Sequence, residues 1–252
     1  MWDFFRKRRL ARARPDDNAF AQVVAEFPVL ARLSRDQQSC LLERTTEILA
    51  DKTFQGAGGL ELDDGDSLVV ATMAALPILE LGIDWYRGFH TFIVYAGEFQ
   101  ADFEEVDEDG VVHRGRDLRA GEAWAHGPVV LGLNEVLASG RGEGYNVVIH
   151  ELAHQIDQLN GDMDGFPPLH RGMDPQQWAE VFSQSYQNLC DELDNDQEPS
   201  LDPYAAESPA EFFAVASEFY FDVPEWFAEN HPELRELMRQ FYHPGDNSAY
   251  GD

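Results

Sequence analysis

Residues 146–161 of the chain read NVVIHELAHQIDQLNG and place two histidines and a glutamate inside an otherwise apolar run. The apolar residues recur with helical spacing, so the stretch predicts a largely buried helix with Asn146 as its N-terminal cap. Side chains four residues apart lie above one another on one helix face. His150 and His154 should therefore project side by side, at a separation that suits one metal ion.

Glu151 is rotated by about 100° from His150 on such a helix, so it would reach a metal-bound water rather than the metal. This is the H-E-x-x-H arrangement of zinc peptidases. A catalytic zinc ion takes three protein ligands and keeps one open position, and it lowers the pKa of bound water to about 7. Glu151 would accept the proton of that water and pass it to the leaving amine.

The HExxH pattern is short, and it also arises by chance on solvated helices of proteins without a metal. The apolar neighbours argue against a chance match here. Burying two histidines and a carboxylate without partners costs on the order of several kcal/mol, and a bound metal would remove that cost. The sequence therefore favours a zinc site, and metal content in the purified protein would exclude the chance match.

A third ligand is needed, and the residues just after the helix do not supply it. In the extended H-E-x-x-H-x-x-G-x-x-H pattern, Gly and His would stand where this chain has Asp157 and Asn160. A glutamate from a later helix is the alternative, and residues 204–221 offer Glu207, Glu211 and Glu218. Spacing alone does not choose between Glu211 and Glu218, and Glu211 could instead close a capping box on Ser208.

Charge is distributed unevenly over the 252 residues, whose formal net charge is −29. Residues 1–14 hold six basic residues and one acid, a local net of +5, and the rest holds 12 basic and 46 acidic residues, a net of −34. Such a body repels phosphates, so direct nucleic-acid binding is not expected. An acidic, lysine-poor surface is also one way to stay solvated at high salt, which suggests a salt-tolerant source as readily as an ordinary acidic enzyme.

The basic N-terminus lacks the apolar segment of a secretory signal. A weak contact with a membrane surface or a partner through Trp2, Phe4 and Phe5 is conceivable, but a solvated, fraying terminus is the expectation. Residues 68–83 form the longest apolar stretch, which is too short for a membrane span and contains Pro77. The two cysteines form no CxxC pair, so we expect a reducing, cytoplasmic setting.

The remaining pattern predicts an α+β fold, with strands in the first half and helices in the second. Helices are expected at about 18–33, 35–51, 67–80 and 231–242, after Asp174-Pro175, and after Ser208-Pro209. Strands are expected at Phe89–Ala96 and Gly127–Val136, with a hairpin turn at DEDG between Val106 and Val111. Residues 53–66 are expected to be a connector, and 243–252 to fray.

Several motifs together resemble the Mlc titration factor A family. They are VVIHELAHQID, the LNG and DGFPPL segments that follow, YAAESPAEFFAVASEFYF, and upstream LPILELGIDWY and VVLGLNEV. The resemblance covers about residues 15–245. It implies a gluzincin metallopeptidase, related to the catalytic core of anthrax lethal factor, with a zincin-like fold of a small mixed sheet and surrounding helices.

The same resemblance implies roles for two further residues. It places the third zinc ligand at Glu211 and a transition-state tyrosine at Tyr204, whose phenol can donate a hydrogen bond to a developing oxyanion. It also implies a cytoplasmic peptidase of aminopeptidase type that binds the transcription repressor Mlc, which controls glucose-uptake genes. Asp157, on the face of the two histidines, could hold the second N–H of a ligand histidine or be a surface carboxylate.

These observations predict a basic tail at 1–14, one metallopeptidase domain at 15–245 and a frayed end at 246–252. One Zn²⁺ would be held by His150, His154 and Glu211, with Glu151 as base and Tyr204 as electrophile. A peptide substrate could lie as an added strand along residues 128–133, taken as the sheet edge. The alternative is a regulatory protein that sequesters a repressor, with a structural or vestigial metal site. Glu151 favours catalysis, since a structural metal needs no base.

Overall fold

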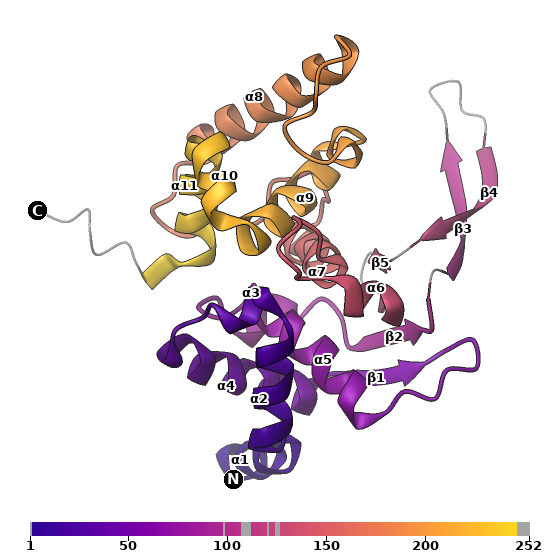
Figure 1. Ribbon diagram of the computed structural model, residues 1–252, viewed down its shortest axis with the longest axis vertical. Coiled ribbons are helices and arrows are strands. Elements are labelled where there is room, and N and C mark those ends of the chain that lie inside the picture. The colour runs from indigo at the N-terminus through magenta and orange to yellow at the C-terminus, as the bar shows by residue number, and fades with distance from the viewer. Residues whose placement is uncertain (1, 98, 107–111, 120, 124–126, 246–252) are drawn as a thin grey trace, which may run out of the picture.

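Helices surround one small sheet in the computed structural model, which describes residues 2–97, 99–106, 112–119, 121–123 and 127–245 (Figure 1). The helices before α7 are α1 Trp2–Ala13, α2 Asp17–Glu26, α3 Pro28–Ala31, α4 Arg35–Asp51, α5 Asp64–Ala75, the 3₁₀ helix η1 Ile83–Tyr86 and α6 Leu133–Ala138. From α7 on they are α7 Val147–Asp157, η2 Gln158–Asn160, α8 Pro175–Asp194, η3 Pro203–Ala206, α9 Pro209–Asp222, α10 Pro224–Asn230 and α11 Pro232–Tyr242. The expectation of an α+β fold is confirmed.

The main sheet has four strands in the order β1-β2-β6-β5. These strands are β1 Thr53–Gly56, β2 Thr91–Tyr95, β5 Gly121–Ala123 and β6 Val129–Gly132. The first three in sheet order run parallel, and β5 pairs antiparallel with β6, so the sheet is mixed. β6 therefore lies inside the sheet, and our expectation that residues 128–133 form an edge is wrong, because β5 covers that side.

A second, two-stranded sheet extends away from the helical body (Figure 1). Its strands are β3 Phe99–Val106 and β4 Val112–Arg119, which pair antiparallel from Phe99↔Arg119 to Val106↔Val112. The two strands of the expected hairpin are thus present. The DEDG turn itself lies outside the described residues.

One hydrophobic core connects the N-terminal and C-terminal helices through α5 and α7. Residues 68–76 of α5 and the turn after it are buried, which explains why the longest apolar stretch of the sequence lies there. The core helix α7 lies beside α9, α5 and β5. Burying α7 on several sides fixes the position of its polar residues, because a close-packed helix cannot shift without opening cavities.

Capping residues start the later helices where the sequence predicts. Asn146 accepts a hydrogen bond from the Ile149 N–H at the start of α7, and Asp174 caps α8. Ser208 accepts from the Glu211 N–H at the start of α9, and Pro209 is the first residue of that helix. Each cap satisfies an otherwise unpaired backbone N–H, so these boundaries are determined locally.

Three expectations about elements are wrong in part. The helix expected at 18–33 is split into α2 and α3, because Phe27 precedes Pro28 and adopts an extended conformation (φ −105°, ψ 115°). The connector at 53–66 contains β1, which pairs in parallel with β2. The strand expected at 127–136 ends at Gly132, and the chain continues as α6.

The N-terminal segment also differs from expectation, since α1 is a helix rather than a fraying tail. It lies against α4, where Arg6 pairs with Glu47 at 3.0 Å and Arg9 with Asp51 at 3.4 Å. Within the described ranges, no helix is both long and apolar enough to cross a membrane.

Lys52 follows α4 and is one of only two lysines in the chain. Its side chain is 1% exposed, and Nζ donates to the carbonyl oxygens of Tyr86 (2.6 Å) and Phe89 (2.7 Å) and pairs with Asp51. Burial outweighs the ion pair and lowers the pKa of Lys52. The ammonium group thus joins the end of α4 to the segment that leads into β2.

Candidate metal centre

The candidate metal centre lies between α7 and α9, which pack directly on each other. α7 contributes His150 and His154, one turn apart, and α9 contributes Glu211 from its first turn. Ser208 fixes where α9 begins, so the chain leaves the preceding loop with Glu211 directed at α7. The second half of the capping box is not formed at this helix, and the Glu211 carboxylate contacts the histidines instead.

Three donor atoms converge at this point. His150 Nε2 lies 2.9 Å and His154 Nε2 lies 3.2 Å from the same oxygen, Glu211 Oε2, and the two nitrogens lie 3.2 Å apart. A tetrahedral zinc site with bonds of about 2.0–2.1 Å places its ligand atoms roughly 3.3 Å from one another. The triangle of donors therefore has the size that such an ion requires, and its two imidazoles and one carboxylate are the donor types that zinc accepts.

Glu218 is not part of this triangle, but it contacts one of the two histidines. Its Oε1 lies 2.8 Å from His150 Nδ1, and its Oε2 accepts a hydrogen bond from the backbone N–H of Asn146. A carboxylate at Nδ1 holds that nitrogen as the N–H donor, which leaves Nε2 with its lone pair toward Glu211. Glu218 is therefore placed to orient His150, while Glu211 is the glutamate that joins the donor triangle.

Electrostatics in the centre favour positive charge. Burial lowers the pKa of His150, but its hydrogen bonds with Glu211 and Glu218 outweigh burial and raise it well above the usual value. Burial raises the pKa of Glu211, and the two histidines outweigh this effect and hold the pKa well below the usual range. Burial keeps the pKa of Glu218 raised despite His150. The carboxylates thus stabilise a cation at the histidine nitrogens.

Glu151 is buried, with 5% of its surface exposed, and it lies under the edge strand β5. A Cβ atom added at Gly121 would overlap the Glu151 carboxylate. Only glycine allows the β5 backbone to pass this close. Glu151, the expected base, therefore lies directly beside strand β5 at the edge of the sheet.

Tyr204 lies in η3, and its ring centroid is 5.8 Å from that of His150. Tyr204 is 45% exposed, whereas Phe212 and Phe213 in the following helix α9 are buried. Asp202 caps η3 by accepting from the Tyr204 N–H at 2.9 Å. The tyrosine expected from the resemblance therefore lies near His150 and is partly open to solvent.

Asp157 does not have either of its expected roles. It is fully buried, so it is not a surface carboxylate, and its Oδ2 accepts from the Gly165 N–H at 2.7 Å. Its Oδ1 and His154 Nδ1 have no hydrogen-bond partner among the described residues. Burial raises the pKa of Asp157 to about 6. Its contact instead ties the end of α7 to the loop that follows.

Asp222, at the end of α9, is a structural residue that sequence reasoning missed. Its Oδ2 accepts from the backbone N–H groups of Gly142, Glu143 and Gly144, in the loop before α7. Glu211, Glu218 and Asp222 are spaced by seven and four residues, which puts them on one face of α9. That spacing is the signal that could have identified both Glu218 and Asp222 as contacts with the α7 segment.

Comparisons with known proteins agree with this geometry. A family model described as "Glucose-regulated metallo-peptidase M90" matches residues 2–243. A protein named Mlc titration factor A from Escherichia fergusonii is 38% identical over 232 residues, which is 91% of this chain and 86% of that protein.

Further proteins of the same name are similar over most of their length. Those of Enterobacter sp. (strain 638) and Salmonella agona (strain SL483) are each 37% identical over 230 residues, covering 90% of this chain and 85% of the relative. The range matched by the family model, residues 2–243, includes α7, η3 with Tyr204, and α9. The family description implies a metal, and the group of His150, His154 and Glu211 could bind one.

Proposed function

This chain belongs to the glucose-regulated metallo-peptidase M90 family and is a relative of the proteins named Mlc titration factor A, and we propose that it is a zinc-dependent peptidase of aminopeptidase type. The observation that carries the proposal is the donor triangle of His150, His154 and Glu211 beside Glu151. A structural zinc site is closed by four protein ligands, whereas three ligands beside a carboxylate that can accept a proton suit hydrolysis.

A bound Zn²⁺ would supply an activated water and would polarise the scissile carbonyl. The residues of this chain would transfer the proton, stabilise the developing charge and orient a histidine. Glu151 accepts the proton of the attacking water and delivers it to the nitrogen of the leaving amine. The phenol of Tyr204 donates a hydrogen bond to the carbonyl oxygen as negative charge develops there. Glu218 keeps His150 in the tautomer that offers Nε2.

Strand β5 is the proposed substrate platform. It is an edge of the sheet, it is antiparallel to β6, and its Gly121 lies against Glu151. An extended peptide that pairs with β5 would bring its backbone past the base, because the unpaired groups of an edge strand recruit another strand. This assignment replaces the one we made for residues 128–133.

The partner proposal rests on the relatives' name, Mlc titration factor A. We infer that this chain also binds an Mlc-type repressor in the cytoplasm, through a surface separate from Glu151. Residues 15–245 would act as the peptidase domain. A pull-down with Glu151→Gln should then retain the repressor, and loss of binding by this folded variant would place recognition in the active site.

The test of the proposed activity combines metal content with peptide hydrolysis. Purified protein should carry one zinc per chain and should cleave peptides with a free N-terminus faster than N-blocked ones. Glu151→Gln keeps the side-chain shape, so zinc should stay bound while nearly all activity disappears. Activity within a few-fold of wild type in this variant would overturn the mechanism, and a metal-free protein would overturn the zinc assignment.

A further inference from the structure

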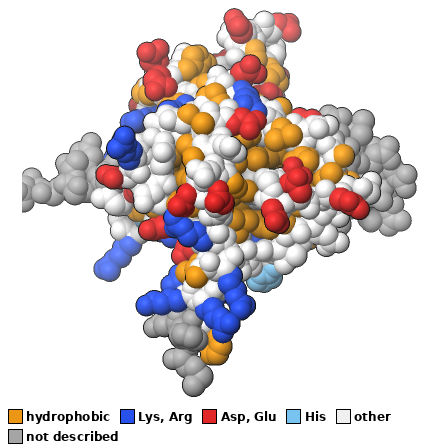
Figure 2. Space-filling model, turned by 60° about the horizontal axis from the view of Figure 1, so that its bottom comes forward, with side chains coloured by type: hydrophobic (Ala, Val, Ile, Leu, Met, Phe, Trp, Pro, Cys, Tyr) orange, Lys and Arg blue, Asp and Glu red, His pale blue; other side chains and the backbone are white. Residues whose placement is uncertain are grey.

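Helix α1 carries a concentration of positive charge in an otherwise acidic chain. Residues 1–14 hold six of the 18 lysines and arginines, although the whole chain has a net charge of −29. The side chains of Arg6, Lys7, Arg8, Arg9 and Arg12 are all exposed. Figure 2 shows Lys and Arg side chains gathered in the lower part of the view, where the N-terminal end of the molecule comes forward.

The side of α1 that faces α4 is neutralised. Arg6 and Arg9 pair there with Glu47 and Asp51, and Leu10 on the same side is half-buried. Glu47 also binds Arg44, so it is shared between two cations. These contacts explain how the helix is attached to the body, and they account for only two of its cations.

A neighbouring side of α1 carries cations together with an aromatic ring. Phe5, Arg8 and Arg12 are spaced by three and four residues, so they form one stripe along the helix. Phe5 is 60% exposed. Among the described residues, no carboxylate lies within ion-pair distance of Lys7, Arg8 or Arg12. This side therefore keeps its positive charge.

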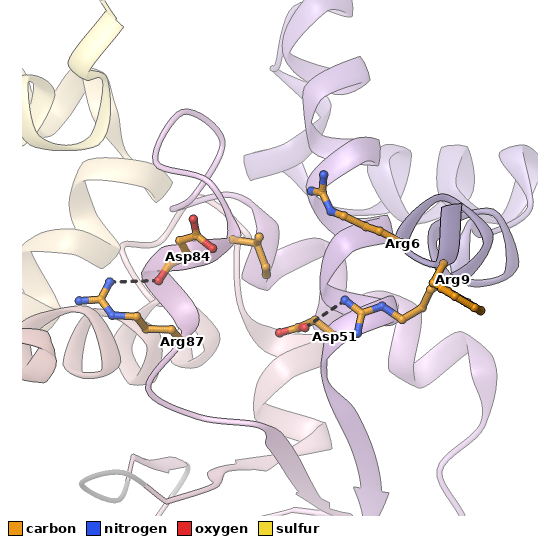
Figure 3. A pocket seen from close by; sticks show the side chains of 7 residues that line it. Arg6, Arg9, Asp51, Asp84 and Arg87 are labelled. Atoms are coloured by element: carbon orange, nitrogen blue, oxygen red, sulfur yellow. Dashed lines mark hydrogen bonds and ion pairs between the residues drawn. The ribbon is translucent and has the colours of Figure 1, made fainter. Parts of the chain in front are cut away.

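Two open hollows flank the stripe. One, of about 490 Å³, is lined by Phe5, Arg8, Arg9, Arg12, Leu49 and Ala50. The other, of about 670 Å³, extends from α1 to η1, where Arg87 lies across from Arg6 and Arg9 (Figure 3). Both hollows thus combine guanidinium groups with apolar surface, and guanidinium groups suit phosphate oxygens.

We infer that α1 docks this protein on an anionic phospholipid bilayer, with Lys7, Arg8 and Arg12 at the headgroup phosphates and Phe5 at the interface. Cations together with an exposed aromatic ring are typical of interfacial helices, whereas the phosphate backbone of a DNA duplex offers Phe5 no apolar layer to enter. The acidic body does not prevent docking. α1 lies at one end of the long axis and α8 at the other, and charges further away than about 10 Å are largely screened at 0.1 M salt (Figure 1).

Vesicle co-sedimentation of the full chain tests this inference. The protein should bind vesicles containing about 30% phosphatidylglycerol in phosphatidylcholine, and not vesicles of phosphatidylcholine alone. The double variant Arg8→Ala/Arg12→Ala should lower the partition coefficient about 30-fold, because each interfacial cation contributes roughly a factor of five. Binding should also fall when salt is raised to about 0.3 M.

Two variants separate surface docking from a general loss of charge. Arg35→Ala/Arg171→Ala removes the same charge from exposed positions outside α1 and should bind vesicles like wild type. Phe5→Ala should weaken binding while leaving its salt dependence unchanged, since it removes only apolar contact. All variants should keep wild-type peptidase activity, so a folding defect would be recognised.

Three outcomes would overturn the inference. They are equal binding to neutral and anionic vesicles, equal loss of binding in the two double-arginine variants, and binding to duplex DNA without binding to vesicles. The last outcome would assign the basic side of α1 to nucleic acid instead.

Discussion

Glu211 and Glu218 contact the same histidine from opposite sides of its ring. Glu211 meets His150 Nε2, and Glu218 meets Nδ1 and also the N–H of Asn146. Loss of a metal ligand and loss of a residue that orients a ligand have different consequences for affinity. The two glutamates can therefore be distinguished by how tightly their variants hold zinc.

We predict that Glu211→Ala loses zinc and activity together, because two histidines alone leave the site incomplete. Glu218→Gln should retain zinc but bind it about 10–100-fold more weakly, since the amide can present its N–H₂ to His150 and disturb the tautomer. Chelator competition with the purified variants gives both affinities. Full zinc occupancy in Glu211→Ala, with loss of zinc in Glu218→Gln, would reverse the two assignments.

Asp157 predicts a pH dependence of stability in the metal-free protein. Its folded pKa, about 6, lies above the ordinary value of 3.8, so the folded state binds the proton more tightly than the unfolded state. Protonation of Asp157 therefore contributes most to the free energy of unfolding below about pH 4. That contribution falls by up to roughly 3 kcal/mol as the pH rises to about 6.

Asp157→Asn should remove that dependence and raise the free energy of unfolding at pH 7, because the amide oxygen can still accept from Gly165. Denaturant unfolding between pH 4 and 7 measures the effect. Asp162→Asn, at an exposed position, is the matched control and should follow wild type. A wild-type profile in Asp157→Asn would show that this carboxylate does not titrate in the expected range.

At the scale of elements, the contact between β5 and α7 links the sheet edge to the proposed base. Gly121→Ala should displace the Glu151 carboxylate, because the added methyl group occupies its position. A displacement of about 1 Å can lower turnover roughly 100-fold. Zinc content should stay at the wild-type value, since Glu151 is not part of the donor triangle.

Gly88→Ala provides the control for this variant. Its added Cβ would lie at ordinary contact distances from Gln155 and Leu159, 3.6 and 3.7 Å, and it should leave peptidase activity unchanged. Wild-type activity in Gly121→Ala would show that β5 can move away from α7 without consequence.

Elements with local signals could be predicted from the sequence. The starts of α7, α8 and α9 depend on caps and on proline, which act within a few residues. β1 was missed because its four residues are stabilised by pairing with β2, some 38 positions later in the chain. The end of β6 at Gly132 was missed because apolar residues recur in α6 and no capping side chain marks where that helix begins.

In the candidate site, too, local features could be predicted from the sequence and features that depend on tertiary packing could not. Helix spacing placed His150 and His154 side by side, and the structure brings them together. Spacing could not choose between Glu211 and Glu218, because the choice depends on how α9 packs against α7. The family resemblance chose Glu211, and the packing of the two helices supports it. Asp157 was misjudged because the tertiary contact with Gly165 is not visible in the helix pattern.

At the scale of the whole molecule, a net charge of −29 predicts sensitivity to ionic strength. Like charges on the surface repel one another in the compact state, and added ions screen that repulsion. We predict that the Tm rises when KCl is increased from about 0.05 M to about 1 M. A Tm that stays constant or falls would contradict this prediction and the suggestion of a salt-tolerant source.

The distribution of lysines has a practical consequence. Lys52 is buried with its ammonium group bonded to two carbonyl oxygens, so Lys7 on α1 is the one lysine that solvent reaches. Amine-reactive dyes and activated sensor surfaces should therefore couple to the lysines of the folded protein at a single position. Because α1 lies at one end of the molecule, copies coupled through Lys7 would be immobilised in a similar orientation, with α7 and α9 directed away from the support (Figure 1).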